Sequence, residues 1–411
     1  MILPDPDISI LARQVVDRLD ELGMVSDDPD RLVRTFLSPA SLRANALVGG
    51  WMRDAGLTVV EDMFGNLTGS REGLPGSGKW VVGSHLDTVV DAGRFDGPAG
   101  VLLGIAVAAA LPTLPFGLEI VGFSDEEGVR FQSTYLGSRA YSGLITQEEL
   151  AQRGSDGISL GELAEARRQA GYPSLPVELS ALRGYLEIHI EQGPVLEAAG
   201  LPLGVVPGVA GQTRIWAGFT GRAGHAGTTP MPLRRDALTA ASHMILATEA
   251  YAREHAPLLA TVGKMEVLPG AGNVIPGKVR FSLDVRSPDN AARHAGLAYL
   301  RAYGTALAAK HGLTWHWEVK QDGDAVAFDP ALIAELAKSV AAQQWQVPYL
   351  FSGAGHDAAV MAGVCPAAML FVRCRGGLSH HPDEYATPAD LASALQAAVH
   401  FMLSLAKEFH A

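Results

Sequence analysis

Cysteine is scarce in this sequence of 411 residues, which contains only Cys365 and Cys374. Two cysteines are too few for the disulfide framework of a secreted scaffold, and they fit a reducing compartment. The two could pair, but two buried thiols on neighbouring elements are the favoured interpretation. The N-terminus places no basic stretch before an apolar one, so it has no recognisable signal peptide. We therefore expect a cytoplasmic protein.

Basic residues are also few: 32 Lys and Arg stand against 44 Asp and Glu, which gives a net charge of −12. A surface that binds nucleic acid or an anionic membrane needs clustered Lys and Arg, so the charge argues against both partners. No uncharged apolar run approaches the ~20 residues that a membrane span needs. Low-complexity segments and short-period repeats are absent as well.

The length and the 48% hydrophobic content predict a globular protein with two domains. Apolar strands at 81–82 and 118–123 flank a helix at 98–110, and strand–helix–strand with buried strands is typical of a parallel sheet. Such sheets carry their sites on loops at the carboxyl ends of the strands. Helical patterns at 330–344 and 388–407 enclose a further strand at 367–373.

The pattern of elements changes after Pro207-Gly208. The predicted order is βαββαβ, which is the split-βαβ arrangement of a ferredoxin-like α+β domain. Its elements are expected at 212–219, 236–255, 260–267, 278–285, 290–312 and 314–321. We interpret 209–322 as a domain inserted into an α/β domain that comprises 1–208 and 323–411.

The first candidate site follows the strand that ends near Val82. His85 and Asp87 come directly after it, and Asp96 stands beyond a Gly-rich turn. A lone histidine here is more often structural, but Asp96 favours a metal site with His85 and Asp96 as ligands. Asp87 would then hydrogen-bond the other imidazole nitrogen and fix its tautomer.

Further histidines and acids occur in separate segments. Adjacent acids such as Glu126 and Glu127 usually lie on a solvated helix face, but here they follow an apolar strand, so one can bind metal and the other can act as a base. His189 lies on an alternating strand that puts Glu187 and Glu191 on the same face, and a packed core histidine is the alternative. The pair His380-His381 could be surface decoration. Together, these clusters favour a two-metal hydrolase.

Several motifs together resemble a known family over nearly the whole chain. They are Gly83-Ser-His-Leu-Asp-Thr, Arg94-Phe-Asp-Gly, Asp125-Glu-Glu-Gly, His189-Ile-Glu-Gln-Gly-Pro-Val-Leu-Glu197, Gly221-Arg-Ala-Gly-His-Ala-Gly-Thr-Thr-Pro-Met231, Asp284-Val-Arg286, Ser352-Gly-Ala-Gly-His-Asp357 and Ser379-His380-x-Pro. The chain resembles the carbamoylase and allantoate amidohydrolase branch of the aminoacylase/carboxypeptidase metallohydrolases. His189-Ile-Glu-Gln-Gly-Pro is the most specific motif, because the peptidases place an acid where His189 stands.

The resemblance implies a phosphorylase/hydrolase-like metallopeptidase catalytic domain with a mixed central sheet, and an inserted ferredoxin-like lid that forms a homodimer. It implies two divalent cations per subunit, with Asp96 bridging them. One cation would be held by His85, Asp96 and His189, and the other by Asp96, Glu127 and His380. His380 is favoured over His381 because the family's ligand directly follows Ser and stands two residues before Pro. Zinc or manganese is expected, with cobalt and nickel as alternatives.

The resemblance also implies the roles of the remaining site residues. Glu126 would be the general base, and His225 would stabilise the oxyanion. The substrate contacts would be Gln192, His225, Asn273, Arg286 and His356. Arg286 would pair with a substrate carboxylate, and His225 and Asn273 would reach the active site of the partner subunit.

The implied reaction is hydrolysis of a linear ureido group with release of ammonia and carbon dioxide. Polar residues in the stretch 131–135 favour allantoate as the substrate. N-carbamoyl-L-amino acids, ureidoglycolate and β-ureidopropionate are alternatives, and a dinuclear exopeptidase or N-acyl amino acid deacylase is a more distant one. A binding protein that has kept the fold without the chemistry is disfavoured, because every matched ligand and Glu126 are retained.

Overall fold

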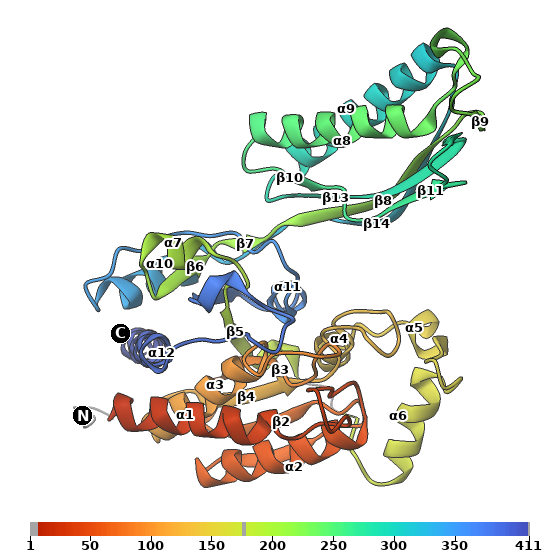
Figure 1. The fold of residues 1–411 in the computed structure, drawn as a ribbon. Helices are drawn as coiled ribbons and strands as arrows, with labels where there is room; N and C mark the ends of the chain where they lie inside the picture. The colour runs from red at the N-terminus through yellow and green to blue at the C-terminus, as the bar shows by residue number, and fades with distance from the viewer. Residues whose placement is uncertain (1–6, 175–177, 410–411) are drawn as a thin grey trace. The chain divides into compact units, whose positions relative to one another are not determined.

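The computed structural model of this protein describes residues 7–174 and 178–409. The chain divides into two compact units (Figure 1). Unit 1 comprises Met1–Pro207 and Ala327–Ala411, and unit 2 comprises Gly208–Val326. The segment that the sequence predicts as an insertion, 209–322, falls within unit 2. The short strands β7 (Gly208–Val209) and β15 (Val326–Ala327) pair where the chain passes from one unit to the other.

Unit 1 is built on a mixed sheet of seven strands in the order β1-β2-β4-β3-β5-β16-β6. The strands are β1 (Thr58–Glu61), β2 (Leu67–Arg71), β3 (Lys79–His85), β4 (Gly117–Phe123), β5 (Leu182–Ile190), β6 (Leu203–Val206) and β16 (Ala367–Val372). The central strands β4, β3, β5 and β16 are parallel neighbours, whereas the outer strands pair antiparallel. The parallel strands are buried, as their apolar sequences require.

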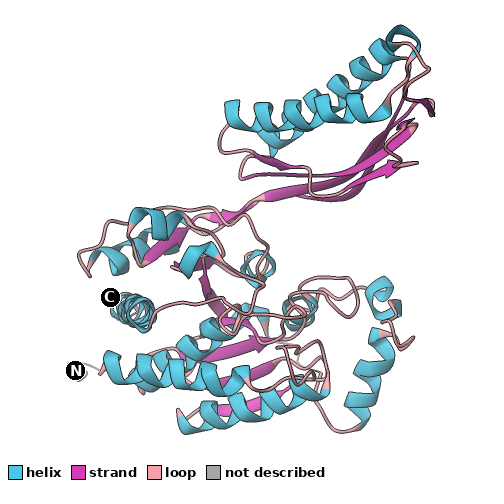
Figure 2. Cartoon of the chain, in the orientation of Figure 1, coloured by secondary structure: helices cyan, strands magenta, loops and turns pink. Residues whose placement is uncertain are grey.

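Helices cover both faces of this sheet (Figure 2). They are α1 (Ile8–Gly23), α2 (Pro39–Asp54), α3 (Pro98–Ala110), α4 (Leu136–Tyr141), α5 (Gln147–Ala151), α6 (Leu160–Gln169), α7 (Val195–Ala199), α10 (Pro330–Ala341), α11 (Asp357–Met361) and α12 (Pro388–Glu408). Short 3₁₀ turns lie at Leu179–Ala181 and Arg375–Gly377. The helices α1, α3, α10 and α12 contribute to one apolar core with the sheet. Ser38 caps α2 through its side chain, and Pro39 follows at the first helical position, where its missing N–H costs no hydrogen bond.

Alternation along the strands decides which residues face this core. On β3, β5 and β16 the core residues are even-numbered, and they include Val82, Ile188 and Leu370. Successive side chains of a strand point to opposite faces, so the odd-numbered His85 and His189 face away from this core. Both histidines stand at the carboxyl ends of their parallel strands.

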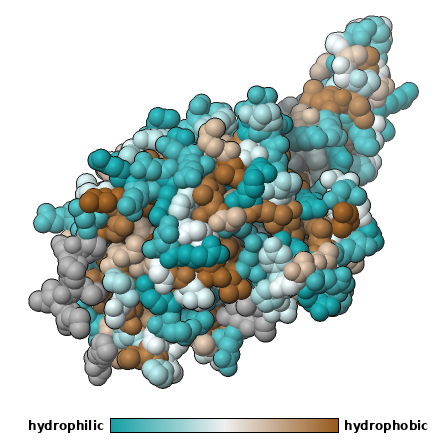
Figure 3. All heavy atoms as spheres, turned by 90° about the horizontal axis from the view of Figure 1, so that it is seen from below, coloured by the Kyte–Doolittle hydropathy of each residue, from teal (hydrophilic) through white to brown (hydrophobic). Residues whose placement is uncertain are grey.

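The closing helix α12 is long and apolar enough to cross a membrane by length and composition, with a mean hydropathy of 1.3. More than half of that stretch is buried, and many of its side chains belong to the unit 1 core. A core helix of a globular domain has the same properties. On the face that Figure 3 shows, hydrophobic and hydrophilic side chains are interspersed.

Unit 2 contains an antiparallel sheet with the strand order β10-β13-β8-β14, and β11 also pairs with β13. Two long helices, α8 (Ala237–Glu254) and α9 (Asn290–His311), lie side by side on one face of this sheet (Figure 2). Its strands are β8 (Gly211–Thr220), β10 (Leu259–Thr261), β11 (Met265–Leu268), β13 (Lys278–Ser287) and β14 (Thr314–Gly323), with a separate pair, β9 (Gly224–His225) and β12 (Val274–Ile275), and a 3₁₀ turn at Met231–Leu233.

The prediction of one continuous strand at 260–267 is wrong. The structure has two short strands there, β10 and β11, separated by a break at 262–264. Both strands pair antiparallel with the long strand β13, so the segment keeps its direction in the sheet on either side of the break. Edge strand β6 and the short helices α4 and α7 are elements that sequence periodicity missed, because each is too short to show a repeat.

Candidate metal centre

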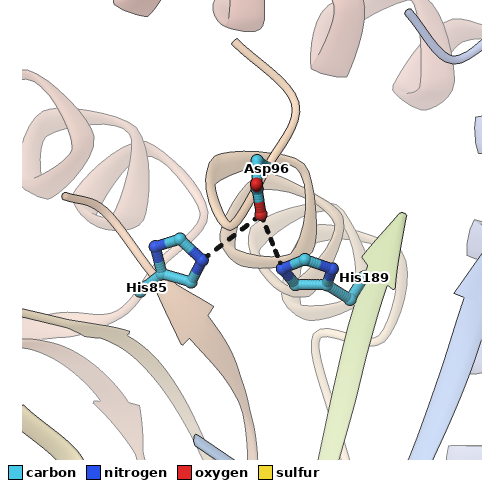
Figure 4. A group of neighbouring side chains, drawn as sticks. All are labelled: His85, Asp96 and His189. Atoms are coloured by element: carbon cyan, nitrogen blue, oxygen red, sulfur yellow. Dashed lines mark ion pairs between the residues drawn. The ribbon is translucent and has the colours of Figure 1, made fainter. Parts of the chain in front are cut away.

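Two histidines and one aspartate converge at the carboxyl edge of the unit 1 sheet (Figure 4). The imidazole Nε2 of His189 lies 3.0 Å from Asp96 Oδ1, and that of His85 lies 3.6 Å from the same oxygen. The two rings are stacked with their centroids 5.7 Å apart. All three side chains are buried.

The hydrogen bonds of the two imidazoles indicate their tautomers. Nδ1 of His85 lies 3.1 Å from the carbonyl oxygen of Asp87, and Nδ1 of His189 lies 2.9 Å from that of Ile190. A carbonyl can only accept, so each Nδ1 carries a proton, and a neutral ring then presents the lone pair of Nε2 to the carboxylate. Facing acceptors need a cation or a proton between them, and the set of two imidazoles and one carboxylate suits a divalent metal.

A second group shares the same aspartate. Nε2 of His380 lies 3.2 Å from Asp96 Oδ2 and 3.3 Å from Glu127 Oε1. Asp96 therefore offers one oxygen to each group, which is the arrangement of a bridging ligand. The neighbouring His381 accepts a hydrogen bond from the backbone of Asp383 instead. The structure thus brings His380, and not His381, to the cluster.

The charges in this cluster depend on one another. Burial alone would raise the pKa of Asp96, but hydrogen bonds from His189, His380 and His85 lower it well below the usual range. Hydrogen bonds to Asp96 and Glu127 raise the pKa of His380 to about 10. Without a cation these histidines hold protons, and a divalent metal would take the place of those protons.

Asp87 has a wider role than the sequence suggests. Its Oδ1 lies 3.4 Å from Nδ1 of His85, but it also accepts the backbone N–H of Glu126 at 3.0 Å. Its Oδ2 accepts the backbone N–H of Glu127 at 3.2 Å. One carboxylate therefore orients a ligand histidine and holds the acidic loop in place.

Glu126 is buried beside the cluster, and burial raises its pKa well above the usual range against the attraction of His85. Such a carboxylate is suited to accepting a proton near neutral pH. Glu126 also forms a third possible ligand group with His85 and Glu127, whose donor atoms all lie within 4.8 Å of one another. The geometry thus admits Glu126 as a base or as a ligand.

Comparison with known proteins identifies the family. The sequence model described as Peptidase family M20/M25/M40 matches residues 81–404. The chain belongs to this family. It is 41% identical to an allantoate deiminase of Arabidopsis thaliana, over 96% of this chain and 83% of that protein. It is 39% identical to an N-carbamoyl-L-amino acid amidohydrolase of Geobacillus stearothermophilus, over 97% and 99% of the two chains.

Solved structures agree with this membership of the M20/M25/M40 family. The crystal structure of an amidase of the hydantoinase/carbamoylase family from Burkholderia multivorans matches with a TM-score of 0.90. Its sequence is 36% identical, and the match covers 96% of this chain and 98% of that chain. The resemblance that the motifs indicate is therefore confirmed, and so is the mixed α/β fold of unit 1.

Gln192, which the sequence predicts as a substrate contact, also binds residues of the metal cluster. Its Nε2 donates to Asp96 Oδ2 at 2.9 Å and to Ser379 Oγ at 3.1 Å. A carboxylate can only accept, so the amide must present its nitrogen to Asp96. Its Oε1 is buried and has no hydrogen-bond partner among the described residues. That oxygen is available to accept from a bound molecule.

His356 lies in the same region but is only 1% exposed. Its Nε2 is 2.8 Å from Ser352 Oγ, and its ring packs against His189 with the centroids 4.5 Å apart. Burial lowers its pKa well below the usual range, so His356 is neutral. It supports the His189 ring directly, whatever contact it makes with a substrate.

Strain in the backbone is concentrated near these residues. Asp125, Gln192 and His380 have φ angles of 54°, 56° and 54°. Non-glycine residues rarely adopt this left-handed region, which costs about 1–3 kcal/mol each. The packing of unit 1 holds these segments in conformations that they would not adopt alone.

The other predicted substrate residues lie in unit 2. His225 is on β9, which pairs with β12. Asn273 is the residue directly before β12. Nδ1 of His225 accepts the backbone N–H of Gly227, so a neutral ring carries its proton on Nε2. Arg286 is on β13, where Asp284 accepts from its Nε at 2.8 Å and from its Nη2 at 2.9 Å.

The sequence predicted no role for some residues that shape the site. Ser379 donates to Asp96, and Glu384 accepts from the backbone of Asp96. Glu191, predicted to share the face of His189, instead accepts the backbone N–H groups of Val195 and Leu196 at the start of α7, because β5 ends at Ile190.

Cys365 and Cys374 are both free and buried.

Proposed function

We propose that this protein is a metal-dependent amidohydrolase that cleaves the C–N bond of a linear ureido group and releases ammonia and carbon dioxide. The observation that carries the proposal is Asp96, which offers one oxygen to His85 and His189 and the other to His380. Its ligands would be His85, Asp96 and His189 for one cation, and Asp96, Glu127 and His380 for the other. Zinc or manganese suits these ligands, with cobalt and nickel as alternatives.

Bound cations would polarise the carbonyl and increase the acidity of the attacking water. Glu126 would take the proton from that water and return it to the leaving ammonia, since its raised pKa suits both steps. Asp87 would keep Glu126 in place through the backbone bond at 3.0 Å. His225 would donate from Nε2 to the oxyanion.

Gln192 favours a ureido group over an acyl group. Its Nε2 is occupied by Asp96, and its buried Oε1 lacks a partner among the described residues. A ureido group ends in an NH₂ that can donate to this oxygen, whereas the carbon chain of an acyl group cannot. An N-acyl amino acid deacylase acting on a simple acyl chain would leave the acceptor unsatisfied, which costs free energy in a buried site.

Allantoate is the substrate that we propose. The allantoate deiminase and the N-carbamoyl-L-amino acid amidohydrolase described above differ by only two percentage points in identity to this chain, so both chemistries have close relatives. Gln132 and Thr134 are exposed polar residues on the loop after the acidic segment, and a second ureido group needs polar partners. N-carbamoyl-L-amino acids are the alternative, with ureidoglycolate and β-ureidopropionate beyond them.

An ammonia-release screen tests this proposal. The protein would be loaded with zinc or manganese and given allantoate, N-carbamoyl-L-amino acids, ureidoglycolate and β-ureidopropionate. N-acetyl amino acids would be the controls, and their hydrolysis would be followed by release of the free amino acid, because it produces no ammonia. We expect the highest kcat/KM for allantoate and none for the acetylated controls. A preference for an acetylated amino acid would contradict the ureido assignment. A preference for a carbamoylated amino acid would contradict only allantoate.

We further propose that unit 2 is a ferredoxin-like lid that forms a homodimer in the cytoplasm. Arg286 pairs across from Gln212 near one end of β13, whereas His225 and Asn273 lie beyond the other end, which begins at Lys278 (Figure 1). Arg286 stands eight positions after Lys278 on this strand, a distance of about 26 Å, which is much longer than allantoate. One substrate cannot touch both sets from a single copy of unit 2, so we assign His225 and Asn273 to the partner's site.

A further inference from the structure

Asp96 is the only residue shared by the two ligand groups that would hold the two proposed cations. Its Oδ1 faces His85 and His189, and its Oδ2 faces His380. A rotation of this one carboxylate would disturb both groups at once. The residues that hold Asp96 therefore affect both ligand groups. Their proposed role rests on the two-cation site described under the proposed function.

Two residues from a distant loop hold Asp96. Ser379 Oγ donates to Asp96 Oδ2 at 2.8 Å, and it also lies 3.0 Å from Glu384 Oε2. Glu384 Oε1 accepts the backbone N–H groups of Phe95 at 2.8 Å and of Asp96 at 2.9 Å. Glu384 therefore contacts Asp96 at its backbone directly and at its side chain through Ser379.

Glu384 is 3% exposed, which is unusual for a carboxylate. Burying a carboxylate near Asp96 is costly unless its oxygens are hydrogen-bonded. Here Oε1 accepts two backbone N–H groups, and Oε2 lies within hydrogen-bond distance of the Ser379 hydroxyl. Gly93 also makes room for it. A Cβ atom at position 93 would lie 2.4 Å from Glu384 Cβ and 2.5 Å from its Oε1.

We propose that Glu384 is a positioning residue that fixes Asp96 as the bridge between the two cations. It acts through the backbone N–H groups of Phe95 and Asp96 and through Ser379. The contact with Gly93 sets the place of the Glu384 side chain. Neither Glu384 nor Ser379 touches a cation in this proposal.

Cation binding by the purified full-length protein tests the proposal without any substrate. Zinc affinity would be measured by chelator competition, and the visible absorption spectrum of the cobalt-substituted protein would report on ligand geometry. Gly93→Ala replaces neither a metal ligand nor Glu384, but its methyl group displaces the Glu384 side chain. Gly50→Ala is the matched control, because nothing lies within 4 Å of a Cβ atom there.

We expect Gly93→Ala and Glu384→Ala to weaken zinc binding about 10–100-fold, as is typical when a residue that orients a metal ligand is lost. Both should alter the cobalt spectrum, whereas Gly50→Ala should not. Glu384→Gln should stay near the wild type, because its amide oxygen still accepts both N–H groups and its nitrogen can donate to Ser379. This rescue separates positioning from a need for charge.

Unchanged zinc affinity and an unchanged cobalt spectrum in Gly93→Ala and Glu384→Ala would overturn the role of Glu384 alone. Failure of the wild-type protein to bind two cations would instead overturn the proposed function on which this role rests. If Glu384→Ala does not fold, Ser379→Ala decides with Gly93→Ala, since removing the hydroxyl must also weaken zinc binding. The folded state of each metal-free variant would be checked by circular dichroism.

Discussion

At the scale of single residues, two carboxylates that are neighbours in the sequence have different environments and different proposed roles. Glu126 and Glu127 are adjacent and both of their backbone N–H groups bind Asp87. Glu127 nevertheless approaches His380, whereas Glu126 is buried near His85 and Asp357, the charges that most affect its pKa after burial itself. One carboxylate thus belongs to a ligand group, and the other has the environment of a base.

The paired changes Glu126→Gln and Glu127→Gln test this division. We expect Glu126→Gln to lower kcat by about 10²–10⁴-fold with the metal content unchanged, because an amide cannot accept the proton. Glu127→Gln should lower the metal content instead. Steady-state kinetics and metal analysis on the same preparations give both readouts. Loss of a cation from Glu126→Gln would contradict its role as a base and support its role as a ligand.

Asp62 is a buried carboxylate outside the site that predicts a pH dependence of stability. It accepts from the backbone of Phe64 and from both the backbone and side chain of Asn66. Burial raises its pKa from 3.8 to about 6 despite these bonds. The folded state therefore holds a proton on Asp62 at a pH where the unfolded state has lost it.

The sign follows from this difference. A raised carboxyl pKa means that the protein loses stability as the pH rises from about 4 to about 6. A shift of about two units corresponds to about 3 kcal/mol. The free energy of unfolding in urea, measured for the wild type relative to Asp62→Asn, should fall by this amount between pH 4 and pH 7. A difference that is independent of pH would contradict the prediction.

At the scale of elements, the site depends on how closely helix α3 approaches the end of β3. Gly97 precedes α3 with a φ of 81°, and a Cβ atom there would lie 2.5 Å from the ring of His85. Only glycine allows this close contact and this backbone conformation together. The first ligand histidine is thus held by the start of the helix that follows it.

Gly97→Ala should therefore push His85 away from Asp96 and weaken cation binding by at least about tenfold. Gly56→Ala is the control for backbone strain, since Gly56 has a φ of 79° but nothing within 4 Å of a Cβ atom. Calorimetric titration with zinc compares the two variants, and thermal unfolding shows whether they lose similar stability. Equal zinc affinities in the two variants would show that His85 tolerates the methyl group.

At the scale of the whole molecule, two sets of predicted substrate contacts lie far apart within unit 2. Arg286 is opposite Gln212 in the pairing of β13 with β8, and His225 is opposite Val274 beyond the start of β13. The sheet is rigid, so this separation persists in any arrangement of the two units. The proposed dimer is the simplest way to bring both sets to one substrate.

Mixing two inactive variants tests this sharing. Glu126→Gln disables a site from unit 1, and His225→Ala disables one from unit 2. If His225 acts in the partner's site, each mixed dimer contains one intact site, and subunit exchange should restore about a quarter of wild-type activity. Allantoate turnover after co-refolding measures the recovery. If both residues served the same subunit, every site would lack one of them and the mixture would stay inactive.

The sequence by itself determined the local elements and the chemical types of the ligands. The predicted helix at 98–110 has the bounds of α3, and the predicted strands at 278–285 and 314–321 lie within β13 and β14. These predictions rest on apolar periodicity and capping residues, which act over a few residues. The motifs around His85 and His189 likewise indicated a metal site before any geometry was known.

Only the tertiary structure decided how those residues combine. Glu384 lies 288 positions from Asp96 along the chain, yet it accepts the backbone N–H of Asp96. The direction of the Gln192 amide also depends on Asp96. Such contacts follow from the order of strands in the sheet and from buried hydrogen-bond donors that need acceptors, and no local pattern encodes them. The sequence motifs thus indicate Asp96 as the bridging carboxylate, and the tertiary fold holds its side chain in place.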